Sequence, residues 1–270
     1  MFKIGLKTNV KMPLKQENTQ NDNYVFVGPA GCGKTTFFTI MAYDYRERAN
    51  NSGGKLIFRC KNKTDRFLTA CINQLKKGDW PAKTQISDEP LNTYDFTIIK
   101  QGKLLKKSAT LAYHDYPGEI YSAAFEEELQ QPLSQTQKDA VESLKNAIKI
   151  AHGIFLLVDA EALYIDDNLA NTTITNFFEY LQGSKCSAKL AIVFNKLELF
   201  GETINEQVAE EMLKKKFPGA YAWLLTVKRK KIFTVKTLGT IKTGESGELL
   251  PPSTRISQGV LEVADWMLGF

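Results

Sequence analysis

The sequence predicts an α/β domain arranged as a three-layer sandwich, with a six-stranded, mostly parallel sheet between helices on both faces. Short apolar runs rich in β-branched and aromatic residues alternate with longer segments of helical periodicity. The chain has 270 residues, of which 43% are hydrophobic, and this suffices for one substantial core. We therefore expect one domain over residues 23–270, after a polar and flexible leader at residues 1–22.

Six short apolar runs are the predicted strands, and the first is YVFV. The second and third flank QGKLLKK, a short connection with a glycine, which predicts an antiparallel hairpin and one antiparallel edge strand. Longer helical segments separate the other strands, so these are expected to run parallel. The predicted strands are residues 24–27, 94–100, 108–114, 153–159, 190–194 and 232–235.

Seven segments have helical patterns, and one of them belongs to a helical insertion predicted at about residues 50–80. Residues 238–259 are rich in turn-forming residues and are expected to form a long loop before the last helix. The predicted helices are residues 35–48, 65–77, 135–151, 169–182, 204–215, 220–230 and 257–268.

Charge and cysteine content exclude several classes of protein. The net charge is +5, with basic clusters at residues 213–217 and 228–231. Either cluster could meet an acidic partner, nucleic acid or an anionic membrane, but neither is interleaved with aromatic residues, so solvated helix faces are the simpler interpretation and no DNA or RNA partner is expected. Four widely spaced cysteines and two histidines predict neither a zinc site nor a disulfide framework. The absence of an 18-residue apolar run or a signal-like start predicts a cytoplasmic protein without a transmembrane segment.

The stretch GPAGCGKTT, residues 28–36, predicts a phosphate-binding loop. It fits the pattern G-x-x-x-x-G-K-[ST] and stands between a predicted strand and a predicted helix. Glycines let successive N–H groups face inward, and the helix directs its positive end at the same point. Lys34 is expected to contact the β- and γ-phosphates, and Thr35 to bind Mg²⁺. The predicted nucleotide-binding residues of this loop are Gly28, Ala30, Gly31, Cys32, Gly33, Lys34, Thr35 and Thr36.

Cys32, at a non-defining position of this loop, has two interpretations. A thiol at a helix N-terminus can have a lowered pKa, so Cys32 could be redox-sensitive, although a small filler is the simpler interpretation. The second half of the site is predicted in ATLAYHDYPGE, where Asp115 and Gly118 follow a strand. An ordinary D-x-P-G turn is the alternative interpretation. Asp115 is expected to hold the Mg²⁺ shell, and the Gly118 N–H to approach the γ-phosphate, because no Cβ blocks it.

The motifs GPAGCGKT, DYPG and NKLE occur in the order found in Ras-like GTPases of the TRAFAC class, which this sequence resembles. The D-x-P-G-E motif, the insertion before GDWPAKT and the late helix GVLEVADWML are similar to the divergent bacterial double-GTPase branch. The resemblance implies binding of GTP and GDP with Mg²⁺. It also implies that Asn195, Lys196 and Glu198 read the guanine and that the Thr237 N–H meets the guanine carbonyl.

Glu198 stands where this family usually has aspartate. A carboxylate there accepts from guanine N1–H and the 2-amino group, whereas adenine offers no such donors. Glutamate is one methylene longer, so tight selection of guanine is in question. An exposed acid with no role in base recognition is the alternative interpretation of Glu198.

The resemblance also implies a threonine that closes over Mg²⁺ and the γ-phosphate. Thr84 is the predicted residue, and Thr93 is the alternative. Closure on the triphosphate would make residues 78–92 an order–disorder switch, with a second switch at residues 115–134 and a regulatory or effector protein contacting both. An ordinary Pro-containing surface loop is the alternative at residues 78–92.

Catalysis is expected to be slow without a partner. Glu119 follows Gly118 where the family commonly has a water-orienting glutamine, and a carboxylate accepts hydrogen bonds but adds negative charge near the γ-phosphate. Arg59 and Arg66 are candidate arginine fingers, with solvated ion pairs as the alternative. His114 could orient water, although a half-buried strand histidine is the commoner outcome. The proposed catalytic residues are Lys34, Thr84 and Glu119.

The leading interpretation is a Mg²⁺-dependent GTP-binding switch that hydrolyses GTP slowly. One alternative is an NTPase or ATPase in which Glu198 does not select guanine. Another is a nucleotide-binding module with negligible turnover, because Glu119 does not activate water.

Overall fold

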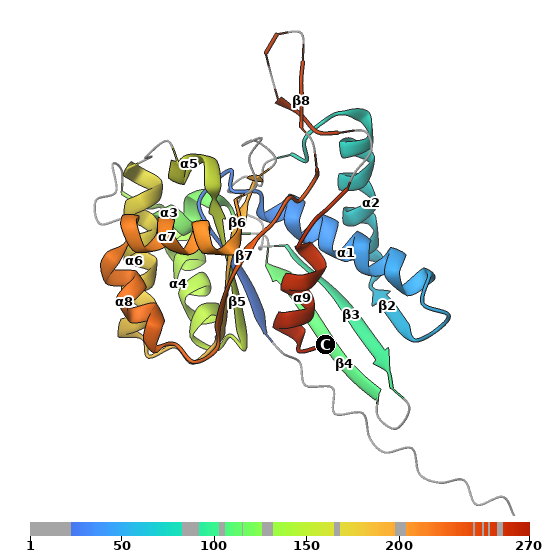
Figure 1. Cartoon of the computed structure of the whole chain (residues 1–270), viewed down its shortest axis with the longest axis horizontal. Helices are drawn as coiled ribbons and strands as arrows, with labels where there is room; N and C mark the ends of the chain where they lie inside the picture. The colour runs from blue at the N-terminus through green and yellow to red at the C-terminus, as the bar shows by residue number, and fades with distance from the viewer. Residues whose placement is uncertain are drawn as a thin grey trace, which may run out of the picture.

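The computed structural model describes residues 23–82, 92–102, 106–114, 116–125, 132–164, 168–197, 204–239, 241–244, 246–247, 249–252 and 256–270. The strands are β1 Tyr24–Val27, β2 Leu56–Cys60, β3 Thr93–Gln101, β4 Lys106–His114, β5 Gly153–Asp159, β6 Lys189–Asn195, β7 Lys230–Thr234, β8 Lys242–Thr243 and β9 Leu249–Leu250. The helices are α1 Lys34–Asn50, α2 Asn62–Lys77, α3 Gly118–Phe125, α4 Gln135–Lys149, α5 Ala160–Tyr164, α6 Asn168–Gly183, α7 Glu206–Lys216, α8 Pro218–Thr226 and α9 Val260–Leu268 (Figure 1).

Four parallel strands form the central sheet in the order β1-β5-β6-β7. Phe26 of β1 lies opposite Phe155 of β5, and Val158 of β5 lies opposite Phe194 of β6. Six of the seven residues of β5 are buried, as expected for a parallel strand covered on both faces. The carboxyl ends of these strands meet at one edge of the sheet, which fixes where loops from distant parts of the chain come together.

A separate antiparallel sheet has the order β2-β3-β4. The predicted hairpin is confirmed as β3 and β4, but the prediction of a single six-stranded sheet is wrong. The edge strands β1 and β4 lie close together, and the rings of Phe26 and Tyr113 meet edge to face with centroids 5.5 Å apart. Among the described residues no hydrogen-bonded ladder joins β1 to β4, so side-chain packing connects the two sheets there.

Strand β2 was not predicted, because it lies inside the segment interpreted as a helical insertion. Its five residues LIFRC follow two glycines and directly precede α2, whose longer amphipathic pattern dominates the segment. β2 pairs with β3 along its whole length, with Phe58 opposite Ile98. The insertion therefore contributes a strand as well as a helix.

Helices cover both faces of the parallel sheet, as predicted (Figure 1). Phe26 of β1 packs in the cluster that contains buried residues of α1 and α9, whereas Val25 and Val27 pack in the cluster that contains residues of α3, α4 and α6. This alternation follows from the two-residue period of a strand. The two apolar clusters are the two halves of a three-layer core.

The seven predicted helices are present, with ends shifted by a few residues. The largest difference is α8, which ends at Thr226 because Lys230 already belongs to β7. The start of α4 is fixed by a capping box, in which the Ser134 hydroxyl accepts from the Gln137 N–H and the Gln137 side chain accepts from the Ser134 N–H.

Helices α3 and α5 were not predicted, and the segment expected to be a loop before α9 contains the small ladder of β8 and β9. Every helix in the described part of the chain is too short or too polar to cross a bilayer.

Candidate functional site

The loop between β1 and α1 curls tightly at the carboxyl end of the parallel sheet. Gly28, Gly31 and Gly33 have φ angles of 150°, 77° and 90°, which residues with a side chain rarely adopt. A Cβ on Gly33 would also lie 2.6 Å from the Asn195 Nδ2 atom. Gly33 is the N-cap of α1, so the positive end of this helix begins inside the loop.

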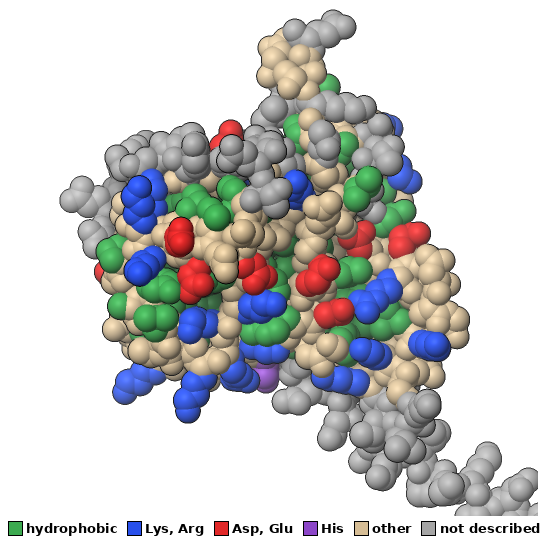
Figure 2. All heavy atoms as spheres, viewed as in Figure 1, with side chains coloured by type: hydrophobic (Ala, Val, Ile, Leu, Met, Phe, Trp, Pro, Cys, Tyr) green, Lys and Arg blue, Asp and Glu red, His purple; other side chains and the backbone are tan. Residues whose placement is uncertain are grey.

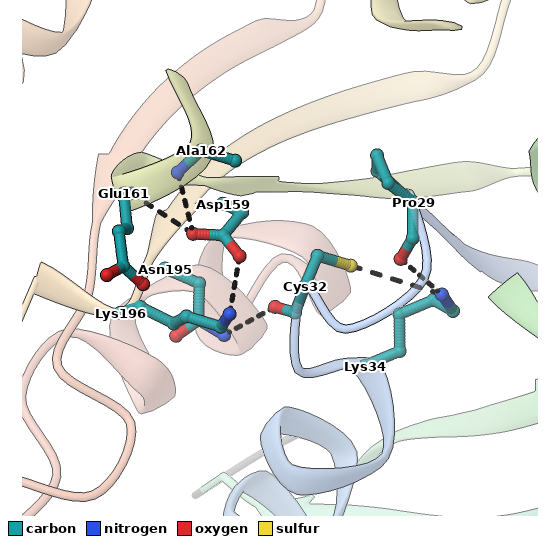
Figure 3. Close-up of polar contacts among 8 residues, drawn as sticks. All are labelled: Pro29, Cys32, Lys34, Asp159, Glu161, Ala162, Asn195 and Lys196. Carbon is teal, nitrogen blue, oxygen red and sulfur yellow. Dashed lines mark hydrogen bonds and ion pairs between the residues drawn. The ribbon is translucent and has the colours of Figure 1, made fainter. Parts of the chain in front are cut away.

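Lys34 is the first residue of α1, and its ammonium group turns back over the loop. Its Nζ atom donates to the Gly28 carbonyl oxygen at 2.8 Å. It also donates to the Pro29 carbonyl oxygen at 3.0 Å (Figure 3). The lysine side chain is buried. A cation is therefore held against the same loop whose N–H groups can bind anions.

Asn195, the last residue of β6, connects the phosphate loop to a third segment of chain. Its Nδ2 atom donates to the Cys32 carbonyl at 2.9 Å (Figure 3), and its Oδ1 atom accepts from the Thr237 hydroxyl at 2.5 Å. Asn195 and Thr237 are both buried. One amide thus fixes the relative positions of the loops that follow β1, β6 and β7.

Lys196, the next residue, forms an ion pair with Asp159 at the end of β5 (Figure 3). The Asp159 Oδ1 atom also accepts from the backbone N–H groups of Glu161 at 3.0 Å and Ala162 at 3.3 Å. Lys196 itself has a φ of 64°. The end of β5 thus holds the ammonium group of Lys196, whose backbone has a left-handed conformation.

Gly118 brings the D-x-P-G segment into direct contact with the phosphate loop. A Cβ on Gly118 would lie 2.2 Å from the Ala30 Cα atom and 2.6 Å from the Ala30 nitrogen. Gly118 begins α3, which the buried side chains of Ile120 and Tyr121 anchor to the core. The exposed Glu119 follows at the surface of the site.

These segments surround a cavity of about 350 Å³. Eleven of the sequence-predicted site residues line it, so the structure brings together most of the predicted set. They are Ala30, Gly31, Gly33, Lys34, Thr35, Thr36, Gly118, Glu119, Asn195, Lys196 and Thr237.

Five predicted residues are not among those that line the cavity. Gly28 and Cys32 belong to the phosphate loop but do not line the cavity. Burial raises the pKa of the Cys32 thiol, which favours the interpretation of Cys32 as a small filler over that of a redox-sensitive thiol. Thr84, Asp115 and Glu198 lie outside the described residues.

The candidate accessory groups lie elsewhere. Arg59 on β2 and Arg66 on α2 are exposed and do not line the cavity. The His114 Nδ1 atom is 3.1 Å from the Thr93 hydroxyl, and burial lowers the pKa of this imidazole. His114 is thus the half-buried strand histidine of the alternative interpretation. Among the described residues neither arginine forms an ion pair, so their part in the molecule stays a prediction.

Sequence reasoning missed several residues that line the cavity. Glu161 follows β5, whose carboxyl end adjoins the phosphate loop, and this position could have indicated it. Residues 80–82 and Tyr116 lie within the two segments predicted as switches, but no motif singled out these side chains. Leu238 and Ile241 come from a connection whose course depends on the tertiary structure. The missed residues are Trp80, Pro81, Ala82, Tyr116, Glu161, Leu238 and Ile241.

Thr35 is the described residue best suited to hold a magnesium ion. Its hydroxyl is 3.1 Å from the Tyr113 hydroxyl, and the residue lines the cavity next to Lys34. A neutral hydroxyl is the kind of hard oxygen ligand that Mg²⁺ accepts, together with carboxylates and phosphate oxygens. The residue present therefore fits a Mg²⁺–nucleotide complex.

Comparison with protein families identifies the class of this fold. The model of the family Double-GTPase 2 matches residues 25–223, which include the phosphate loop, Gly118 and Asn195. The chain belongs to the Double-GTPase 2 family. Membership in this GTPase family supports GTP binding and indicates a P-loop NTP hydrolase. No curated protein matches the chain.

Solved structures similar to this Double-GTPase 2 member include the mammalian SRP receptor, with 14% identity, a TM-score of 0.39, and coverage of 79% of this chain and 90% of that chain. The small COPII coat GTPase SAR1 from Encephalitozoon cuniculi, in complex with GDP, has 13% identity and a TM-score of 0.38. The match covers 93% of this chain and 80% of that chain. A mutation variant of SsGBP has 12% identity and a TM-score of 0.36, with coverage of 79% of this chain and 48% of that chain. The chain thus spans about half the length of the SsGBP variant, and the family assignment rests on the family model.

Proposed function

We propose that this protein is a Mg²⁺-dependent GTP-binding switch that hydrolyses GTP slowly to GDP. The observation that carries the proposal is the cavity itself, which places Lys34, Gly118, Asn195 and Thr237 on one surface. These residues come from four segments far apart in the sequence. Their convergence provides a phosphate end and a base end in one site of nucleotide size.

The phosphate end is the loop of residues 28–36. Its N–H groups, the start of α1 and the Lys34 ammonium group together supply positive potential for a triphosphate. The ammonium group now donates to two loop carbonyls, and it can exchange these for phosphate oxygens without leaving the loop. Charge-assisted hydrogen bonds to phosphate favour that exchange.

The base end lies where Asn195 and Lys196 follow β6. We propose that these residues, with Glu198 and the Thr237 N–H, read the guanine. The Asn195 amide already donates to the phosphate loop and accepts from the Thr237 hydroxyl. Besides its proposed contact with guanine, Asn195 therefore holds the base-binding loop next to the phosphate loop.

For the metal, we propose the Thr35 hydroxyl as a ligand, together with Asp115 and Thr84. When bound, Mg²⁺ neutralises charge that develops on the β- and γ-phosphates. Thr35 is placed for this by its position in the first turn of α1, one residue after Lys34.

Slow turnover is proposed from Glu119, which lines the cavity beside Gly118. An ionised carboxylate there can accept a hydrogen bond from water but cannot donate one to the γ-phosphate. A regulatory or effector protein that contacts residues 78–92 and 115–134 would then control the lifetime of the GTP state.

The deciding experiment is displacement of a fluorescent GDP analogue in the presence of Mg²⁺ by unlabelled GDP, GTP, ADP and ATP. Displacement by guanine nucleotides alone is the expected result. Equal displacement by ATP would favour an NTPase without guanine selection. Absence of analogue binding would contradict the nucleotide site as a whole.

Turnover is tested separately in a single-turnover assay, with the protein in excess over GTP and no other nucleotide present. We expect slow formation of GDP that requires Mg²⁺. Binding of GTP without any GDP formation would favour a binding module with negligible turnover.

A further inference from the structure

The edge of the parallel sheet opposite the cavity is strongly basic. β1, β5, β6 and β7 end at the cavity and begin at this opposite edge, where β4 also begins. Figure 2 shows Lys and Arg side chains gathered along the lower border of the molecule, with Asp and Glu side chains above them. We call this surface the basic edge and define it by Lys107, Lys149, Lys185, Lys189, Lys228 and Arg229.

Backbone hydrogen bonds join the connections that carry these side chains. The Lys189 N–H donates to the His152 carbonyl at 2.9 Å, and the Leu190 N–H donates to the Arg229 carbonyl at 2.9 Å. The Arg229 guanidinium also donates to the Ser187 carbonyl at 2.6 Å. The cations at the end of α4 and after α6 and α8 therefore lie on one continuous surface.

The charges on this surface are close together. Burial lowers the pKa of Lys189, and the neighbouring charges of Arg229 and Lys107 lower it further. The connections at residues 106–108, 149–153, 183–190 and 226–230 contain no Asp or Glu. Within the described part of the chain, no member of the basic edge forms an ion pair with a carboxylate.

Only part of this charge has an explanation within the fold. Lys107 donates to the Gly269 carbonyl and Lys189 to the Trp266 carbonyl, so both complement the negative end of α9. The side chains of Lys149, Lys185 and Lys228 are exposed and make no hydrogen bond or ion pair with other described residues. Concentrated, unneutralised charge of one sign costs stability through repulsion, which an anionic partner would relieve.

The surroundings of Lys149 indicate the chemistry of that partner. Ile150, the next residue, is 70% exposed and lies at the end of α4 on the same edge. An anionic lipid surface accommodates both groups, because phosphates attract the lysines and the interface takes up the isoleucine. Nucleic acid offers phosphates and bases but no apolar interior for the isoleucine. The four connections contain no Phe, Tyr or Trp on which bases could stack, and the rings of Phe270 and Trp266 are already covered by Lys107 and Lys189.

We infer that the basic edge docks this protein on an anionic phospholipid surface. The cavity lies at the other end of the strands, so it would face away from the lipid and stay open to nucleotide and to a partner protein. Docking of this kind does not require the proposed nucleotide chemistry. It is therefore a separate property of the chain.

The test uses the full chain with vesicles of phosphatidylcholine alone and of phosphatidylcholine mixed with phosphatidylserine. We expect binding to the mixed vesicles that weakens with salt, and little binding to the neutral ones. Lys149→Glu/Lys228→Glu should weaken binding to the mixed vesicles at least about 25-fold, because each lysine near an anionic membrane surface raises the affinity about fivefold. Lys76→Glu/Lys77→Glu at the exposed end of α2 makes the same charge change away from the basic edge and should have little effect.

Circular dichroism and thermal unfolding check that each variant is folded before its binding is compared. Ile150→Ser should weaken binding to the mixed vesicles severalfold while leaving binding to a short DNA duplex unchanged. Equal binding to neutral and anionic vesicles would overturn the inference, as would equal losses in the two lysine pairs. Tighter binding to the duplex than to the vesicles, unaffected by Ile150→Ser, would also overturn it and identify a nucleic-acid surface.

Discussion

Gly118 lies so close to Ala30 that a single added Cβ would sit 2.2 Å from the Ala30 Cα atom. Real Cβ atoms do not approach a backbone carbon at this distance, so one of the two segments must move if a side chain is added. Gly118 starts α3 and Ala30 belongs to the phosphate loop. The two halves of the proposed phosphate site therefore share a tight backbone contact.

Gly118→Ala should lower the affinity for GDP by about tenfold or more, roughly 1.4 kcal/mol, because Ala30 must shift away from its present position. Displacement of a fluorescent GDP analogue measures this loss. Gly219→Ala in α8 is the matched control, since an added Cβ there meets nothing within 4 Å. An unchanged affinity in Gly118→Ala would show that the contact is not needed for binding.

Thr237→Val should reduce the free energy of unfolding by about 1–3 kcal/mol, because the buried Asn195 Oδ1 atom loses its hydroxyl donor. Urea denaturation followed by circular dichroism measures the change. Thr237→Ser keeps the hydroxyl and should lose much less. Thr237→Val keeps the methyl group and loses only the hydroxyl, so a loss no larger than that of Thr237→Ser would contradict the role of this hydrogen bond.

Lys34→Ala should weaken GDP binding by about 100-fold or more, roughly 2.7 kcal/mol, because the phosphate end loses its cation. Binding of guanosine, which has no phosphate, should change far less. Comparing the two ligands in the same titration separates loss of phosphate contacts from general damage to the loop. Unchanged GDP affinity would remove the assignment of residues 28–36 as a phosphate loop.

Glu119→Gln should raise the unaided rate of GTP hydrolysis, because an amide can donate to phosphate while accepting from water. The single-turnover rate constant is the measurement, with Glu142→Gln on the exposed face of α4 as the control. A fall of tenfold or more, about 1.4 kcal/mol of barrier, would instead make Glu119 a working catalytic group.

Much of the fold follows from local patterns in the sequence. Fully apolar runs such as those of β5 and β6 stand out because a parallel strand is buried on both faces. The division into two sheets was not predictable, because it depends on how β1 and β4 meet in space. The ring contact of Phe26 with Tyr113 joins residues far apart in the sequence, and no local pattern indicates it.

The site was predicted best where a motif fixes both residue type and spacing. The residues from Ala30 to Thr36 and the pair Asn195 and Lys196 belong to such motifs, and most of them line the cavity. Trp80 and Ile241 line it for a different reason, since tertiary structure brings their connections to the same opening. The ion pair of Lys196 with Asp159 was not predicted, because Asp159 ends β5 and Lys196 follows β6. Only the parallel pairing of these two strands brings the residues together.

The Asn195 side chain has a consequence for the thermodynamics of ligand binding. By joining the Cys32 carbonyl to the Thr237 hydroxyl, it orders the phosphate loop and the loop after β7 as one preorganised frame. The conformational entropy of these loops is then lost during folding, and little of it remains to be lost when a nucleotide arrives. Tight binding can coexist with rapid entry, because two walls of the pocket need no induced fit.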